Sequence, residues 1–125
     1  MTTPFSDDMS GSTDRIAARH VFEARIQIRL QRDDKQRSLP GWARDLSESG
    51  LAAFVAESLI LGELVTLEVP MGDSDKQVIP ATVSRALGTE YGFQFTALSS
   101  EQRKQIRAAL KGHAAIPYHA NRRKL

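Results

Sequence analysis

Two polar clusters in this 125-residue chain contain the residue types that could bind a small ligand. The first is Arg15-Ile-Ala-Ala-Arg19, with two arginines four positions apart, and the second is Asp45-Leu-Ser-Glu-Ser-Gly50, with the spacing D-x-S-x-x-G. An arginine offers a planar fork of donors that binds a phosphate at two points and stacks on a base. A turn that carries a carboxylate and a hydroxyl adds directed hydrogen bonds.

Arginine is used far more than lysine around these clusters. From Arg15 to Arg44 there are seven arginines and one lysine, Lys35, which favours a ligand with both phosphates and purines. The whole chain has 17 basic and 15 acidic residues and a net charge of +2, which is low for a general nucleic-acid binder. We therefore expect no DNA or RNA partner. Arg44, directly before the aspartate, is an additional candidate for ligand binding.

The second cluster has two interpretations. In one, Asp45 accepts hydrogen bonds from a purine base or orients an arginine, and Ser47 bonds to a phosphate or a base. Gly50 then allows a positive φ and a close approach of the backbone to the ligand. In the other, Asp45 and Ser47 close a turn and Gly50 ends it. The arginine pair favours the first interpretation, because two separate reasons for the arginines would otherwise be needed.

Six short strands are predicted to position these clusters. Val21 to Leu30 alternates between apolar and polar residues, which is typical of a half-buried strand. A loop at Gln31 to Ser38 and a break at Leu39-Pro40-Gly41 are expected after it. The further strands are Trp42 to Leu46, Gly50 to Ala56, which we expect to be buried, Leu64 to Val69, Val78 to Leu87, and the stretch with Tyr91, Phe93 and Phe95. This spacing predicts an all-β fold, either a β-barrel or a β-sandwich, and closing the barrel would remove exposed edges. Trp42 could stack on a ligand base, but it is expected in the core.

The pattern changes after Leu98. Residues 99–102 read Ser-Ser-Glu-Gln, which is typical of a helix N-terminus, and Gly112 ends the helix. The apolar stripe of this C-terminal α-helix consists of Ile106, Ala109 and Leu110. We expect one domain over residues 14–112, between a flexible N-terminal arm at 1–13 and a flexible basic tail at 113–125.

Several other chemistries are disfavoured. Ser47 or Ser49 with His20 lacks the G-x-S-x-G pattern and the strand-turn-helix context of a hydrolase, so the protein is not expected to be an enzyme. The three histidines lie far apart in sequence, and no cofactor or metal is expected. The chain has no cysteine, no apolar run long enough to span a bilayer and no secretory signal. We expect a cytoplasmic protein without membrane insertion.

The two clusters, in this order, resemble the R-x-x-x-R and [DN]-x-S-x-x-G motifs of the PilZ domain, a bacterial receptor for the second messenger cyclic di-GMP (c-di-GMP). The resemblance extends to the strand after Arg19 and to Gly92-Phe93-Gln94-Phe95 before the final helix, and it covers roughly Asp14 to Gly112. It implies an all-β, PilZ-like fold, a six-stranded antiparallel β-barrel with a C-terminal α-helix. The residues that it implies bind c-di-GMP are Arg15, Arg19, Asp45, Ser47 and Gly50.

The resemblance also implies how the protein acts. The arginine arm would order over bound c-di-GMP, and the domain would signal to a protein partner, because the chain has no second domain to act on its own. The alternative is a PilZ-like module that binds a protein without nucleotide. Many family members have a further arginine directly before the pair, where this chain has Asp14. That carboxylate favours one c-di-GMP per chain over an intercalated pair, since a pair doubles the phosphate charge.

Overall fold

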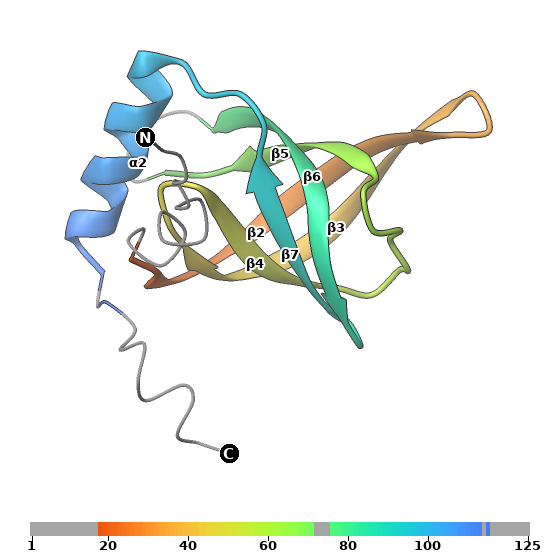
Figure 1. Cartoon of the computed structure of the whole chain (residues 1–125), viewed down its shortest axis with the longest axis horizontal. Helices are drawn as coiled ribbons and strands as arrows, with labels where there is room; N and C mark the ends of the chain where they lie inside the picture. Colours follow the sequence, from red (N-terminus) through yellow and green to blue (C-terminus); the bar gives the residue numbers. More distant parts are fainter. Residues whose placement is uncertain (1–17, 72–75, 114, 116–125) are drawn as a thin grey trace, which may run out of the picture.

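The computed structural model describes residues 18–71, 76–113 and 115. Within them, six strands form a closed antiparallel barrel in the order β2-β3-β4-β7-β6-β5 (Figure 1). The strands are β2 (His20–Arg32), β3 (Lys35–Leu46), β4 (Gly50–Val55), β5 (Leu64–Val69), β6 (Gln77–Leu87) and β7 (Glu90–Phe95). Pairing of β2 with β5 closes the barrel. The predicted fold class is confirmed, and each of the six strands has two neighbours over part of its length, so none is an edge strand throughout.

The first hairpin is longer than the sequence suggested. The predicted loop at Gln31 to Ser38 is wrong, because β2 and β3 continue to a two-residue turn, Asp33-Asp34. Both aspartates have positive φ, 53° and 63°, which short polar side chains tolerate and tight hairpins require. The predicted break at Leu39-Pro40-Gly41 is also wrong. Pairing of β3 with β4 stops at Gly41, so Pro40 lies where β3 has a neighbour on one side only and a missing N–H is tolerated.

The barrel interior holds the hydrophobic core. Alternate residues of every strand point inward and are buried, such as Ile28 in β2, Leu67 in β5 and Ile79 in β6. Trp42 was expected in this core, but it is 41% exposed. Ala43 beside it points inward, so the period of two places Trp42 on the outer face, opposite Phe54 of β4. Phe54 is 39% exposed, so the expectation of a fully buried strand there is wrong at this residue.

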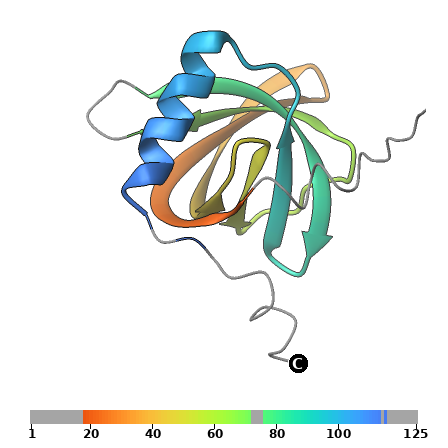
Figure 2. The same ribbon diagram turned by 60° about the vertical axis from the view of Figure 1, so that its left-hand side comes forward.

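A single helix in the described part of the chain, α2 (Ser100–Lys111), covers the end of the barrel opposite the β2–β3 hairpin (Figures 1 and 2). Ser99 is the N-cap and forms a capping box with Gln102, as the sequence predicted. Ile106 and Leu110 are buried against the core. No helix among the described residues is long and apolar enough to cross a membrane.

Candidate ligand-binding site

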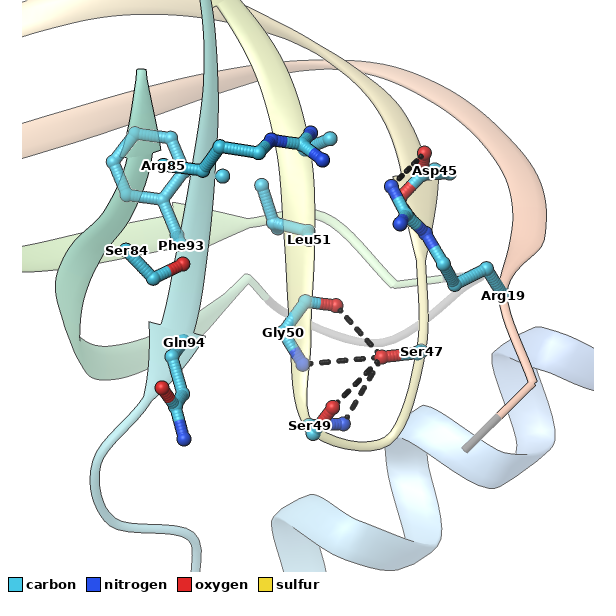
Figure 3. Close-up of a pocket in the computed structure, with 12 residues that line it drawn as sticks. Arg19, Asp45, Ser47, Ser49, Gly50, Leu51, Ser84, Arg85, Phe93 and Gln94 are labelled. Atoms are coloured by element: carbon cyan, nitrogen blue, oxygen red, sulfur yellow. Dashed lines mark hydrogen bonds and ion pairs between the residues drawn. The ribbon is translucent and has the colours of Figure 1, made fainter. Parts of the chain in front are cut away.

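The turn between β3 and β4 is built around the Ser47 hydroxyl. The Ser47 N–H donates to the Gly50 carbonyl at 2.8 Å, and Ser47 Oγ accepts from the N–H groups of Ser49 and Gly50 at 3.1 and 3.2 Å (Figure 3). Ser47 is only 5% exposed. The hydroxyl therefore holds the turn in shape, and ligand binding by Ser47 stays a prediction.

Gly50 is needed for close packing of two strands. A Cβ built on Gly50 would lie 2.0 Å from the carbonyl oxygen of Phe93 in β7, far inside any allowed contact. The expected positive φ is wrong: among the described glycines only Gly62 and Gly88 have one. The close approach that the glycine permits is between β4 and β7, and it brings β7 to the edge of the motif turn.

Asp45 reaches the outer face of the barrel because of a β-bulge. Ala43 points into the core, so regular alternation would point Asp45 inward as well. The register of β3 against β4 shifts between these two residues, and Asp45 pairs with the outward-facing Ala52. The bulge thus keeps a carboxylate out of the apolar interior, where an unpaired charge would be costly.

Arg19 lies directly before β2 and pairs with Asp45 across the barrel wall. Its Nη2 is 2.9 Å from Oδ2 of Asp45 and its Nε is 3.4 Å from Oδ1, a fork-like arrangement. The Arg19 side chain is 44% exposed, whereas that of Asp45 is 12% exposed. Asp45 therefore orients Arg19 while part of the guanidinium still faces solvent.

These residues line one pocket of about 350 Å³ on the outer wall (Figure 3). The register places Asp45, Ala52, Gly92 and Arg85 in one row across β3, β4, β7 and β6. Their neighbours in the lining are Arg19, Ser47, Ser49, Gly50, Leu51, Ser84, Phe93 and Gln94. The small residues Ala52 and Gly92 form the floor of the pocket. Arg19 lies on one side of it, which we call the near side, and Arg85 of β6 lies on the opposite side, the far side.

The far side of the pocket, formed by β6 and β7, was not predicted from the sequence. Ser84, Arg85 and Gln94 line the pocket, although neither of the two ligand-binding motifs includes them. The sequence did offer one signal, the position of Arg85. If Val83 points inward, strict alternation would point Arg85 into the core as well, which indicates that the alternation breaks between them. A register shift between Val83 and Arg85 places it outside instead.

The remaining predicted residues lie elsewhere. Arg44 is at the β3 bulge, and its guanidinium carbon lies 4.8 Å from the ring centroid of Phe54, outside the pocket lining. Arg15, Asp14 and the predicted arm at 1–13 lie outside the described residues. Most of the predicted tail does too, except His113, whose ring lies 5.4 Å from that of Phe22, and Ala115, which forms a β-bridge with His20.

The helix contacts the motif turn from the other side. Arg107 of α2 approaches Glu48 of the turn, with Nε 3.5 Å from Oε1. Both side chains are at least half exposed, so this ion pair contributes little to stability. Within the described residues, no group of three or more His, Cys, Asp or Glu side chains could hold a metal ion.

The barrel and its pocket define a class of small β-barrel domain with an arginine-lined hollow on the outer wall. A model of the PilZ domain family matches residues 13–112, most of the chain. The protein therefore belongs to the PilZ domain family. A comparison with curated protein sequences gave no match.

Solved structures with the same fold include two PilZ domains. The PilZ domain of YcgR from Escherichia coli, solved with c-di-GMP, has a TM-score of 0.63 and 17% identity, covering 88% of this chain and 95% of that one. The PilZ domain of CeSA from a cellulose-synthesizing bacterium has a TM-score of 0.58 and 20% identity, covering 75% of this chain and 95% of that one. At such identities, the likeness concerns the fold.

Proposed function

We propose that this protein is a non-enzymatic receptor for c-di-GMP and that the ligand binds in the pocket of the outer wall. The observation that carries the proposal is the Arg19–Asp45 pair, held beside a hollow with a small-residue floor. A guanidinium has five N–H donors, and two of them face Asp45. The donors that are left can bind the N7 and O6 acceptors of a guanine or the oxygens of a phosphate.

Each motif residue then has a distinct role. Asp45 orients Arg19 and neutralises part of its charge, Ser47 shapes the turn, and Gly50 lets β4 and β7 approach closely. Arg15 supplies a second guanidinium from the N-terminal side. Resemblance to the PilZ family and the YcgR domain solved with c-di-GMP both support this ligand.

The proposal includes the wider role of the domain. The arginine arm, from Asp14 onward and with Arg15, closes over the ligand, and residues 1–13 before it stay flexible. The folded unit spans residues 14–112, and 113–125 forms a flexible basic tail. The closed arm gives a protein partner a surface that exists only in the bound state, so the partner can respond to the ligand. We place the protein in the bacterial cytoplasm, with one c-di-GMP per chain, because Asp14 adds negative charge at the site.

A second candidate function is a protein-interaction module that binds no nucleotide. Trp42 and Phe54 favour it, because these large apolar side chains are paired across β3 and β4 and exposed on the outer wall. Exposed aromatic residues are enriched at protein interfaces. The two functions make opposite predictions for titration with c-di-GMP.

Amide NMR spectra of labelled protein test where the ligand binds. On addition of c-di-GMP, we expect the largest shift changes at Ser49, Gly50, Gly92 and Gln94, which line the pocket. Lys35 at the distant hairpin should not move and serves as the internal control. Saturable changes confined to residues outside the pocket would contradict the proposed site.

A further inference from the structure

Arg85 faces Arg19 from the opposite side of the pocket. In register, Arg85 pairs with Gly92, Gly92 with Ala52, and Ala52 with Asp45. Three inter-strand steps separate the two ends of this row, which is about 14 Å at the usual strand spacing. A long side chain at each end can therefore reach a ligand that lies on the floor between them, and Figure 3 shows Arg85 extending toward β4.

The missing side chain of Gly92 lets Arg85 lie across the floor. A Cβ built on Gly92 would be 3.2 Å from Cβ of Arg85 and 3.5 Å from its Nε. The arginine therefore runs directly over this glycine. Its ion pair within the described chain is with Glu90 at 3.9 Å, a long contact, and its side chain is 46% exposed. Most of its N–H donors are available to a ligand.

The charge of the pocket depends on this residue. The charged residues of the described lining are Arg19, Asp45 and Arg85. Arg19 and Asp45 offset each other because they form an ion pair. Arg85 therefore supplies the net positive charge of this lining. A cyclic dinucleotide carries two phosphodiester charges, and a pocket without net positive charge would attract it weakly.

We propose that Arg85 is a ligand-binding residue of this site and that its guanidinium binds the phosphate side of the cyclic dinucleotide. This inference rests on the proposed function. It assigns a contact from β6, outside both sequence motifs, at the point where a bulge places Arg85 on the outer face. Arg19 and Arg85 then bind the ligand from opposite sides of the pocket, with Gly92 and Ala52 beneath it.

The test compares five proteins by calorimetric titration with c-di-GMP: wild type, Arg19→Ala, Arg85→Gln, Arg85→Lys and Arg37→Ala. Arg37 is the matched control, since it is an exposed arginine paired with an exposed glutamate, Glu57, and does not line the pocket. We expect Arg85→Gln to weaken binding about tenfold or more, as loss of a charged hydrogen bond does. Arg85→Lys should lie between it and the wild type, because lysine keeps the charge but loses the fork.

The outcomes separate the two proposals. If wild type binds, Arg19→Ala weakens binding and Arg85→Gln binds as wild type does, the role of Arg85 is overturned and the proposed function stands. If wild type does not bind, both fail together. An equal loss in Arg37→Ala and Arg85→Gln would also overturn the inference, because general charge would then explain the effect. Unchanged circular dichroism spectra of the variants exclude unfolding as the cause.

Discussion

Replacing Gly50 by alanine should destabilise the barrel rather than remove a ligand contact alone. The added Cβ would lie 2.0 Å from the Phe93 carbonyl oxygen, and ordinary contacts begin at 3.4 Å. The two atoms must separate by the difference, 3.4 minus 2.0, or 1.4 Å. The oxygen belongs to the backbone of β7, which is paired on both sides, so it cannot swing away as a flexible side chain could.

The expected cost lies at the upper end of the range for overpacking, about 3 kcal/mol. For an ordered domain of this size, 1 kcal/mol lowers the melting temperature by about 4–8 °C, so Gly50→Ala should melt roughly 12–24 °C below the wild type. Thermal unfolding followed by circular dichroism measures this shift directly. Binding of c-di-GMP should then be assayed well below the lowered melting temperature.

Gly112→Ala is the matched control. A Cβ built on Gly112 has no atom within 4 Å, and its φ of −89° suits alanine. Its free energy of unfolding should stay within about 0.5 kcal/mol of the wild type. A Gly50→Ala protein that melts within about 3 °C of the wild type would refute the steric reasoning, since one methyl group was predicted to cost far more.

Three further predictions concern the ion pairs and the helix. Arg19→Ala should weaken c-di-GMP binding about tenfold or more in a calorimetric titration, and should cost about 1 kcal/mol of stability or less because the arginine is part exposed. A hydrogen bond from Arg32 holds the pKa of Glu63 below its usual value. The stability that this ion pair contributes is therefore present above the unfolded pKa of about 4.3, and it is lost as the pH falls through the lower pKa of Glu63 in the folded protein. Melting curves of Glu63→Gln should therefore depend less on pH below about 4.3 than those of wild type, and an identical dependence would contradict this. Ser99→Ala should lower the free energy of unfolding in urea by about 1 kcal/mol through loss of the N-cap, whereas an unchanged midpoint would show that the capping box is not stabilising.

The barrel and the helix could be predicted from the sequence because their signals are local. The alternation in β2 follows from single residues and their neighbours, as does the cap at Ser99. The hairpin at Asp33-Asp34 was missed because its polar outer residues and Pro40 look like a loop. Only the pairing of β3 with β2 and β4 shows that Pro40 has a neighbour on one side.

The near side of the pocket, with Arg19 and the turn between β3 and β4, could be predicted from its motifs. The far side, with Arg85 of β6, could not. Arg85 joins the pocket through a bulge in β6 and through Gly92, which lies beneath it. Both depend on strand register, which a single sequence does not determine. The same limit explains why the exposure of Trp42 was not predicted, since its side of the barrel wall is set by the inward Ala43. It also explains why the packing role of Gly50 was not predicted, since that role depends on the backbone of β7, which is distant in sequence.

Calorimetric titration of the wild-type protein with c-di-GMP tests the central claim most directly. We predict saturable binding of one ligand per chain with a low-micromolar or tighter Kd, which corresponds to about 8 kcal/mol of binding free energy or more. The protein concentration should be calibrated independently, so that the ratio is reliable. Absence of heat and of saturation up to about 1 mM ligand would leave at most about 4 kcal/mol and would contradict the assignment of this pocket to c-di-GMP.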